Sequence, residues 1–518
     1  MMRRYINPIG LLIISVAACL HAKVFWDYTI DDAYISFRYA KNLVEGNGLV
    51  FNIGERVEGY TNFLWVLLMA VPEALHYETA TFAKIVGLFS ACICLVLTYL
   101  LGKRIFNNAD GFPALAAPCV LALQSPFILW TVAGLETATG LMFFLAGILF
   151  YLKESKTPVF SWSAVFFFAA GLTRPDLSLG ILVVLVLGGV GLIANCGNKY
   201  RNAALKSFLT LSILTVGYLA WKYFYYGSLL PNTFYAKAPK ENSLLFGADY
   251  LWKFVLYNAF APVLIFAGAP IISKRRMSLI LPFSMIGVYW LYVLIVGGDW
   301  MPMLRFLIVT LPFYALLVQS FIADLSLRLE IMHKYHLAPK IFAAVLAIIL
   351  AMPGLLMFQG LPRHKFYNRI IEQEKSWIQS YKLLGISMGR LLPKGTLVAC
   401  DVAGAFPYYS NLRTIDLDGL TDAHIARYGK GKGRLLGKRD FNYVLDRSPE
   451  VIFLYPSINP FDNRSWSEEE VLDTVAKYMD DQDLRVRFMS EYRYGFWQVN
   501  GWIINAMIRQ DFKPKTEN

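Results

Sequence analysis

Long runs of apolar residues recur along most of this 518-residue chain, and they constrain its fold more than any other feature. A helix needs about 20 apolar residues to cross about 30 Å of hydrocarbon. The composition agrees, because 56% of the residues are hydrophobic and only 17% are charged, whereas a soluble domain carries about 25% charged residues. The sequence therefore predicts a polytopic α-helical membrane protein and excludes a soluble enzyme, a disordered chain and a disulfide-rich secreted module.

Basic residues in the short connections predict how the apolar runs cross the membrane, because Lys and Arg accumulate in cytoplasmic loops. Arg3 and Arg4 place the N-terminus inside, and the connections that follow alternate between basic and nearly uncharged. About 11 transmembrane helices result, at residues 9–25, 82–102, 112–128, 137–152, 158–172, 177–194, 207–225, 251–271, 278–297, 306–325 and 341–358. The apolar piece 63–75 is broken by Pro72 and too short to cross, so we interpret it as an interfacial or re-entrant helix.

The polarity of the chain changes near residue 360 and predicts two domains. Residues 1–360 form the transmembrane domain, with a first outer loop at residues 26–81. Residues 361–518 have ordinary polarity, and strand-like runs such as Val451–Tyr455 alternate there with helical patterns such as Ser467–Met479. The second region is therefore expected to be a small α/β domain on the outer side of the membrane.

The formal net charge of +12 is explained by membrane orientation and not by nucleic-acid binding. Residues 1–360 contain 26 Lys and Arg against 17 Asp and Glu, an excess of nine, whereas residues 361–518 contain 23 against 20. Most of the excess therefore belongs to the membrane region, where cytoplasmic loops supply much of it. We expect membrane lipids, and no nucleic acid, among the partners.

Six polar motifs fall at the predicted outer ends of the spans, although the topology was assigned without them. Ionisable residues in membrane sequence are costly and tend to mark function. The motifs are Asp31-Asp32-Ala33-Tyr34-Ile35-Ser36 with Glu58-Gly59-Tyr60-Thr61-Asn62, Gly134-Leu135-Glu136-Thr137, Thr173-Arg174-Pro175-Asp176, Pro231-Asn232-Thr233-Phe234-Tyr235-Ala236-Lys237 and Gly297-Gly298-Asp299-Trp300. Their shared side predicts one outward-facing polar site over a helical bundle.

The chemistry of these residues suggests attack by a hydroxyl group on a lipid-phosphate-linked group. A carboxylate beside another carboxylate, near apolar surface, has its pKa raised into a range useful for a general base, and Asp31 and Asp32 are adjacent. Cations that can bind an anionic leaving group are Arg38, Arg56, Arg174, Lys237 and Arg305. No single motif establishes this chemistry. An isolated Asp-Asp pair usually caps a helix or lies on a solvated surface, and Asp31 could also cap a helix that begins near Asp32.

Taken together, the motifs resemble those of the bacterial GT-C glycosyltransferases related to the mycobacterial terminal β-(1→2) arabinofuranosyltransferase. The resemblance spans most of the membrane region and extends to Asp416-Leu417-Asp418-Gly419-Leu420-Thr421-Asp422 in the second region. It implies a GT-C-like fold and the inverting transfer of a sugar from polyprenyl phosphate to an acceptor hydroxyl. It also implies a bacterial inner (cytoplasmic) membrane, with the site and the C-terminal domain on its periplasmic side. By analogy the sugar is a pentofuranose such as arabinofuranose, and the acceptor is a glycan or protein of the cell envelope.

The resemblance also implies roles for individual residues. Asp31, with Asp32 as the alternative, becomes the general base, and Arg174 and Lys237 become candidates for binding the donor phosphate. The remaining pocket residues are Glu58, Tyr60, Asn62, Glu136, Asp176 and Asp299. No cofactor is required, because a polyprenyl phosphate is already an activated carrier. The carboxylates could hold a divalent cation, but no dedicated metal cage is visible, and no metal site is predicted.

Two functions of other classes remain open at this stage. A lipid-linked sugar flippase or transporter would also be polytopic, but it would favour polar residues near the middle of the bilayer and inverted repeats. A non-enzymatic assembly protein would not need the cluster of acidic and basic residues.

Overall fold

A computed structural model describes residues 3–106, 112–154, 161–192, 201–237, 242–258, 262, 276–332, 365–430, 438–479 and 481–513. The chain forms two compact units, each assembled from three separate segments. The first unit comprises Met1–Tyr28, Ala83–Tyr218 and Lys240–Ile371, and the second comprises Thr29–Phe82, Leu219–Pro239 and Glu372–Asn518. The expected boundary at residue 360 lies outside the described residues.

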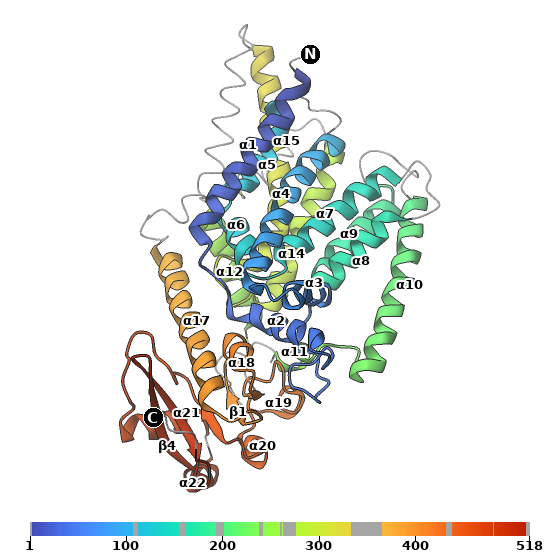
Figure 1. The fold of residues 1–518 in the computed structure, drawn as a ribbon. Coiled ribbons are helices and arrows are strands. Elements are labelled where there is room, and N and C mark those ends of the chain that lie inside the picture. Colours follow the sequence, from blue (N-terminus) through green and yellow to red (C-terminus); the bar gives the residue numbers. More distant parts are fainter. Residues whose placement is uncertain are drawn as a thin grey trace. The chain divides into compact units, whose positions relative to one another are not determined.

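Long apolar helices dominate the first unit (Figure 1). Within the described residues, six helices are long and apolar enough to cross a membrane, or seven if one bent pair counts as a single span. The six segments are Asn7–Phe25, Thr79–Ile105, Thr137–Glu154, Arg201–Tyr226, Met277–Val296 and Arg305–Asp324. They correspond to α1 (Arg3–Ala22) with η1 (Lys23–Phe25), α4 (Thr79–Ile105), α7 (Thr137–Glu154), α10 (Arg201–Tyr226), η4 (Arg276–Leu279) with α14 (Ile280–Val296), and η5 (Arg305–Thr310) with α15 (Leu311–Met332). The chain is a multi-pass membrane protein.

The span expected at residues 112–128 differs from the prediction, because it is bent. After η2 (Phe112–Leu115), α5 (Ala116–Ala122) and α6 (Ser125–Val132) meet at 58°. Pro126 lies in the first turn of α6, and Gln124 before that turn is extended. A proline has no N–H to donate to a carbonyl of the preceding turn, and it is accommodated in the first turn of a helix. The helix therefore stops and restarts at this point.

Other expected spans are short or incompletely described. The helices α8 (Trp162–Thr173) and α9 (Leu177–Gly189) are apolar but have only 12 and 13 residues. Of the span expected at residues 251–271, the structure has α12 (Ser243–Tyr257), which begins eight residues earlier. The rest of that span, apart from residue 262, and all of the span at 341–358 lie outside the described residues, so the number eleven stays a prediction.

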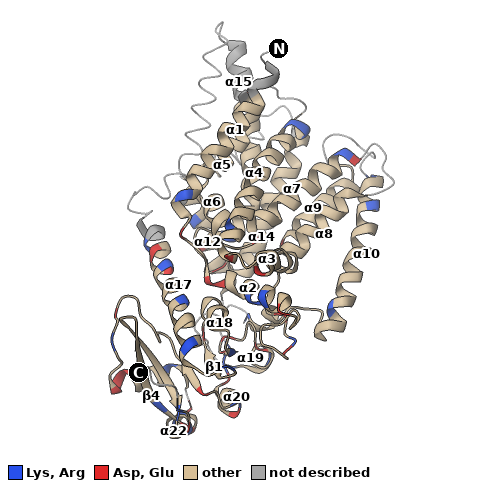
Figure 2. Ribbon diagram, in the orientation of Figure 1, with Lys and Arg blue, Asp and Glu red and all other residues tan. Residues whose placement is uncertain are grey.

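Figure 2 shows few charged residues along α8 and α9, and several along α17.

The first outer loop supplies two helices to the second unit. The first is α2 (Asp31–Val44), and the second is α3 (Phe63–Ala74), which contains Pro72. Twelve residues of helix span about 18 Å, well short of the hydrocarbon thickness. A further short helix, α11 (Asn232–Ala236), comes from the segment after α10.

The C-terminal part of the second unit contains a five-stranded sheet in the order β2-β1-β3-β5-β4. The central strand β1 (Leu397–Cys400) pairs in parallel with β2 (Arg413–Asp416) and β3 (Val451–Phe453), whereas β5 (Trp502–Arg509) is antiparallel to both β3 and β4 (Tyr492–Val499). The helices of this part are α17 (Lys365–Leu391), α18 (Ala405–Ser410), α19 (Ala423–Tyr428), α20 (Phe441–Asp446), α21 (Glu468–Tyr478) and α22 (Gln482–Glu491). A capping box of Ser467 and Glu470 starts α21.

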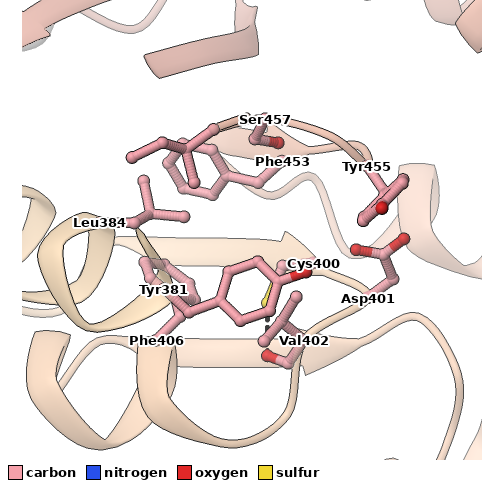
Figure 3. A pocket seen from close by; sticks show the side chains of 10 residues that line it. Tyr381, Leu384, Cys400, Asp401, Val402, Phe406, Phe453, Tyr455 and Ser457 are labelled. Atoms are coloured by element: carbon pink, nitrogen blue, oxygen red, sulfur yellow. Dashed lines mark hydrogen bonds between the residues drawn. The ribbon is translucent and has the colours of Figure 1, made fainter. Parts of the chain in front are cut away.

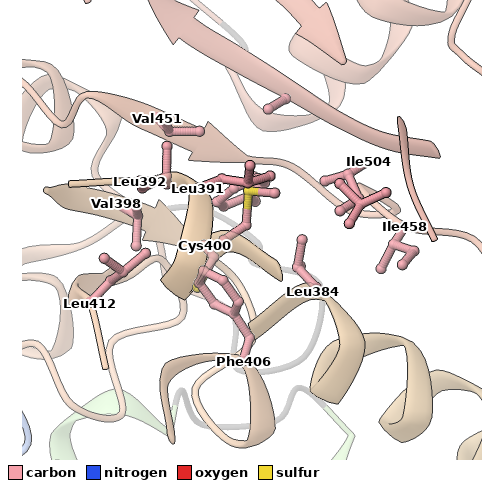
Figure 4. Packing of buried hydrophobic residues seen from close by; sticks show 14 of the residues in the cluster. Leu384, Leu391, Leu392, Val398, Cys400, Phe406, Leu412, Val451, Ile458 and Ile504 are labelled. Atoms are coloured by element: carbon pink, nitrogen blue, oxygen red, sulfur yellow. The ribbon is translucent and has the colours of Figure 1, made fainter. Parts of the chain in front are cut away.

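Alternating side chains of the strands build a hydrophobic core on each face of this sheet. Val398 and Cys400 of β1 lie in one cluster with residues of α17 and α18, such as Leu384 and Phe406 (Figure 4). Ala399 of β1 lies in the other cluster, which includes side chains of α19, α20, α21 and α22. Because successive side chains of a strand point to opposite faces, four residues of β1 are enough to anchor helices on both sides.

Candidate functional site

Asp31 lies at the start of α2, where the loop between β1 and α18 holds its carboxylate. Oδ1 of Asp31 accepts a hydrogen bond from the backbone N–H of Ala405 at 2.8 Å. Gly404 lies so close that a Cβ atom built on it would be 2.1 Å from the backbone oxygen of Asp31 and 2.3 Å from its Oδ2. The alternative that Asp31 caps its own helix is wrong, because α2 begins at Asp31 and its N-cap residue is Ile30.

The surroundings of Asp31 favour its protonated form. Burial raises the pKa of Asp31 to about 7, the N–H of Ala405 opposes this, and the charges of Asp32 and Asp416 raise it further. Asp32 is partly buried in the same first turn. A carboxyl group with a pKa near 7 can accept a proton at neutral pH, so Asp31 has the property expected of a general base.

Asp416 is a buried carboxylate whose charge acts on the partly buried Asp31, and it was not predicted as a site residue. Its Oδ1 accepts from the N–H of Asp418 at 3.0 Å, and its Oδ2 accepts from the N–H of Thr421 at 2.8 Å. Burial raises the pKa of Asp416 to about 6, although the N–H groups of Thr421 and Asp418 oppose the rise. The sequence signal was present in the motif 416–422, which was used only for the family resemblance.

Glu58 forms a buried ion pair that sequence reasoning also missed. Its Oε2 lies 2.7 Å from Nζ of Lys222 near the end of α10, and both side chains are at most 7% exposed. Burial raises the pKa of Glu58 to about 7, and the charge of Lys222 opposes the rise. Beside this pair the hydroxyl groups of Tyr60 and Tyr226 are 2.9 Å apart. A lysine near the end of an apolar helix was the available signal.

The other predicted residues of the second unit have varied surroundings. Asn62 is buried and accepts a hydrogen bond from the hydroxyl of Ser36 at 3.1 Å. The guanidinium group of Arg56 is exposed and lies 4.9 Å from the ring centroid of Tyr225. Lys237 is exposed at the C-terminal end of α11.

Arg38 has a structural role in the second unit. Its side chain is buried and donates to the carbonyl groups of Phe51 at 2.7 Å and Leu412 at 2.7 Å, to the carbonyl of Pro407, and to the Oδ1 of Asn52 at 3.2 Å. A guanidinium group has five N–H donors, so these four bonds use most of its capacity. Arg38 therefore joins the first outer loop to the C-terminal part, and its role in donor binding stays a prediction.

The motif 231–237 contacts the loop that Asp416 organises. Nδ2 of Asn232 reaches the carbonyl oxygens of Gly419, Leu420 and Asp422 at 2.9 to 3.1 Å. The N–H of Asn232 donates to the carbonyl of Glu58 at 2.8 Å. One asparagine thus connects three of the predicted motifs within the second unit.

In the first unit, Arg174 brings two further motifs together at the turn between α8 and α9. Its Nε and Nη2 donate to the two carboxylate oxygens of Asp176 at 3.1 and 2.7 Å. Its Nη1 donates to Oγ1 of Thr137 at 3.0 Å and lies 3.9 Å from Oε1 of Glu136. The side chain of Arg174 is only 3% exposed, so its positive charge is largely committed to these two acidic neighbours.

Asp299 and Arg305 form a second charged group in the first unit. The hydroxyl of Tyr250 donates to Oδ1 of Asp299 at 2.8 Å, and Oδ2 of Asp299 lies 3.6 Å from Nε of Arg305. The guanidinium group of Arg305 lies 5.6 Å from the ring centroid of Trp130 and is 17% exposed. Arg305 is therefore more accessible than Arg174 and holds its carboxylate less closely.

Electrostatic interactions connect the two charged groups of the first unit. Tyr292 interacts with Arg174 and Asp176 as well as with Asp299 and Arg305. The hydroxyl of Tyr289 donates to the backbone oxygen of Asp176 at 3.1 Å. The predicted site residues thus fall into two groups, one in each unit. Within the described residues, no three His, Cys, Asp or Glu side chains are grouped as metal ligands.

Known sequences resemble this chain at two levels, a domain model and two curated proteins. Residues 371–499 match the model of a domain of unknown function, DUF8728. The terminal β-(1→2)-arabinofuranosyltransferase of Mycobacterium tuberculosis is 26% identical over 298 residues, which are 52% of this chain and 46% of that protein. The enzyme of the same name from Corynebacterium glutamicum is 27% identical over 368 residues, which are 60% of this chain and 51% of that protein. The chain spans about half the length of these curated relatives.

Comparisons with solved structures concern the fold. ArnT from Cupriavidus metallidurans bound to undecaprenyl phosphate has a TM-score of 0.54 at 10% identity, over 96% of this chain and 98% of that chain. The oligosaccharyltransferase AglB from Archaeoglobus fulgidus, in complex with an inhibitory peptide and a dolichol-phosphate, has a TM-score of 0.51 at 11% identity, over 99% of this chain and 75% of that chain. The chain shares the fold of these two proteins. The predicted resemblance to the terminal β-(1→2)-arabinofuranosyltransferases is confirmed by the two curated relatives.

Proposed function

We propose that the protein is a membrane glycosyltransferase that moves a sugar from a polyprenyl phosphate to a hydroxyl group of a cell-envelope glycan or protein. The observation that carries the proposal is the Asp31 carboxyl group, whose pKa is raised to about 7 and whose Oδ1 is held by a backbone N–H. The names of the two curated relatives support sugar transfer. The lipid phosphates named with the solved structures support a lipid-linked donor.

In the proposed reaction, Asp31 accepts the proton of the acceptor hydroxyl as its oxygen attacks the anomeric carbon. The bond between that carbon and the phosphate oxygen breaks, and the polyprenyl phosphate leaves with the electron pair. Attack opposite the leaving group inverts the anomeric centre. Asp32 stays the alternative base, but the hydrogen bond from Ala405 favours Asp31, because it fixes the direction of that carboxylate.

For the donor phosphate we propose Arg305 as the principal cation. Its side chain is 17% exposed and 3.6 Å from Asp299, whereas Arg174 is 3% exposed and donates to both oxygens of Asp176. A phosphate can compete for a guanidinium group that is accessible and loosely paired. We propose that Arg174 orients Glu136 and Asp176, and that the exposed Lys237 adds to the positive charge available to the donor. No cofactor is required in this scheme.

The finer assignments extend the same proposal. We propose a pentofuranose such as arabinofuranose as the sugar, because both curated relatives are named for its transfer. We propose that Glu58, Tyr60 and Asn62 shape the pocket around donor or acceptor, and that the site and the C-terminal part face the periplasm, as the basic inner connections indicate.

The test is transfer of labelled arabinofuranose from synthetic decaprenyl-phosphate arabinose to an acceptor by the purified full chain. Asp31→Asn should lower the rate by a factor of about 10² or more, as expected for loss of a general base. The matched control Asp473→Asn changes an exposed aspartate of α21 and should keep wild-type activity. Full activity in both Asp31→Asn and Asp32→Asn would contradict the base assignment. Movement of the lipid across vesicles without transfer would instead support a flippase.

A further inference from the structure

The cavity at the ends of β1 and β3 is too small to hold a ligand. Figure 3 shows Tyr381, Cys400, Asp401, Phe453 and Tyr455 among the side chains that line it. Its volume is about 10 Å³, which is enough for about one water molecule. A partner of the second unit would therefore bind on an exposed surface, and the surface formed by α11 and α19 has the chemistry for one.

Three exposed apolar side chains follow the end of α10. Leu229, Leu230 and Phe234 are 52%, 43% and 61% exposed. Phe234 is the middle residue of α11, and Asn232 and Ala236 on either side of it are buried. Residues four apart share a face of a helix, whereas residues two apart do not. The short helix therefore buries one face and presents Phe234 on the other.

These side chains begin where α10 leaves the membrane. The helix is long and apolar enough to cross a bilayer, and five of its last six residues, Trp221–Tyr226, are aromatic, as is typical of the membrane interface. Leu229 and Leu230 follow the helix by three and four residues, so they lie at most about 14 Å from its end. The headgroup region on each side of a bilayer is about 5–8 Å thick. The apolar side chains are thus within reach of the lipid headgroups.

Basic side chains lie beside the apolar ones. Arg427 and Lys430 are exposed, at the end of α19 and just after it. The guanidinium group of Arg427 lies 4.8 Å from the ring centroid of Tyr235, the residue next to Phe234. Segments 227–237 and 423–430 contain no Asp or Glu.

The acidic residues that flank α19 in the sequence are committed to hydrogen bonds. Asp422 caps α19 through the N–H groups of His424 and Ile425, and Asp440 caps α20 through the N–H of Tyr443. Oδ2 of Asp440 also lies 2.9 Å from Nε2 of His424. The charge that α11 and α19 present is therefore positive, which suits an anionic partner.

Hydrogen bonds join α11 to α19, so that the two helices present one surface. Nδ2 of Asn232 donates to the carbonyl groups of Gly419, Leu420 and Asp422 at 2.9 to 3.1 Å. Nζ of Lys438 donates to the carbonyls of Tyr235 and Ala426, each at 2.8 Å. Figure 1 shows α11 beside α19. Whatever binds α11 therefore also positions the C-terminal part that carries α19.

We propose that this surface, named here the α11–α19 surface and defined by Leu229, Leu230, Phe234, Arg427 and Lys430, binds anionic lipid headgroups at the membrane surface. The apolar side chains insert at the boundary between headgroups and acyl chains, and the two cations contact lipid phosphates. The C-terminal part is thereby held against the membrane. The inference requires that α10 crosses the membrane, and it is independent of sugar transfer.

The test places a fluorescent label at position 234 of the full chain, reconstituted at one copy per lipid nanodisc. The six native cysteines are first replaced by alanine, and Phe234→Cys is then labelled with the environment-sensitive fluorophore NBD. Lipids that carry a doxyl quencher near the headgroup should quench this label strongly. The matched control is a label at Phe496→Cys, an aromatic residue of β4 that is 52% exposed, and it should be quenched little.

Anionic lipid tests the role of the cations. Replacing part of the phosphatidylcholine by phosphatidylglycerol should increase quenching at position 234. Arg427→Gln with Lys430→Gln should abolish that increase, because each basic residue near an anionic surface changes the ratio of bound to unbound surface by about fivefold. The control Lys477→Gln with Arg493→Gln removes two exposed cations of α21 and β4 and should leave the increase unchanged.

Three outcomes would overturn the inference, each scored on protein that is monodisperse in size-exclusion chromatography. Equal quenching at positions 234 and 496 would show that the α11–α19 surface does not bind lipid. An effect of phosphatidylglycerol that survives Arg427→Gln with Lys430→Gln would exclude the two cations. Shielding of the label only in nanodiscs with two copies would identify a second copy as the partner. Loss of transfer in Asp31→Asn leaves all these expectations unchanged.

Discussion

At the scale of single residues, the environment of the Asp31 carboxyl group destabilises its charged form. A carboxylate accepting a backbone N–H is normally stabilised, yet burial and two neighbouring aspartates outweigh the hydrogen bond from Ala405. The folded protein therefore binds the Asp31 proton more tightly than the unfolded chain does. The contribution to stability is present at acidic pH and is lost as the pH rises through about 7.

The pH dependence of transfer should follow the ionisation of Asp31. Because a general base must be deprotonated, kcat/KM should rise with pH through a midpoint near 7 and level off above it. Asp31→Asn should remove this rise of kcat/KM with pH together with most of the activity. Its melting temperature at pH 8 should equal or exceed that of the wild type, because the amide carries no charge to bury. A lower melting temperature would mean that the carboxylate stabilises the fold and is not a poised base.

Gly404 should be intolerant of any side chain. A Cβ atom there would come within 2.1 Å of the backbone oxygen of Asp31 and 2.3 Å of its Oδ2. Gly404→Ala should therefore displace Asp31, lower kcat by about tenfold or more and shift the midpoint of the pH profile. Gly217→Ala is the matched control, because a Cβ atom at Gly217 has no neighbour within 4 Å. Equal activities of the two variants would show that the position of Asp31 does not depend on Gly404.

At the scale of elements, the end of α10 is tied to the first outer loop by a buried charge. Nζ of Lys222 lies 2.7 Å from Oε2 of Glu58, and the hydroxyl of Tyr226 donates to the carbonyl of Leu49 at 2.9 Å. Removing one member of a buried pair leaves the other charge without compensation, which typically costs about 3–5 kcal/mol. Replacing both members is much less costly.

Lys222→Met should therefore destabilise the protein strongly, and Lys222→Met with Glu58→Gln should recover most of the loss. The measurement is the melting temperature in detergent, and size-exclusion chromatography monitors the loss of folded protein on heating. Lys253→Met is the control, because its ion pair with Asp249 is exposed and of similar length, 2.6 Å; such pairs contribute about 0–1 kcal/mol. If the double variant melts no higher than Lys222→Met, the packing of Lys222, and not its charge, is what matters.

The elements also show what the sequence could and could not predict. Glu136 and the pair Arg174 and Asp176 come from two motifs at predicted span ends, and the structure joins them, because neighbouring spans that end on one side bring their ends together. The position of Arg38 could not be predicted, since its partners Pro407 and Leu412 lie 369 and 374 residues later in the chain. Lys222 was overlooked because it was counted as part of an apolar run. The bend before Pro126 was missed because hydropathy does not register a break in hydrogen bonding.

At the scale of the whole molecule, the orientation across the membrane is a prediction that chemical labelling can check. A cysteine introduced at the exposed Phe496 should react with a membrane-impermeant maleimide in cells with a permeable envelope but an intact inner membrane. A cysteine at Lys153, the exposed basic end of α7, should react only after the inner membrane is opened. This follows from the accumulation of Lys and Arg on the cytoplasmic side. The opposite labelling pattern would reverse the topology and move the proposed site to the cytoplasm.

The second unit is built from three segments that the ribosome makes at different times. Arg38 donates to the carbonyl of Leu412, 374 residues later in the chain. At about 5–20 residues per second, a ribosome needs roughly 20 to 75 s to synthesise that interval. During that time two of the four acceptors of Arg38, the carbonyls of Pro407 and Leu412, have not yet been made. If the first outer loop faces the periplasm as we propose, a periplasmic chaperone or protease would meet an unfinished loop before the last third of the protein exists.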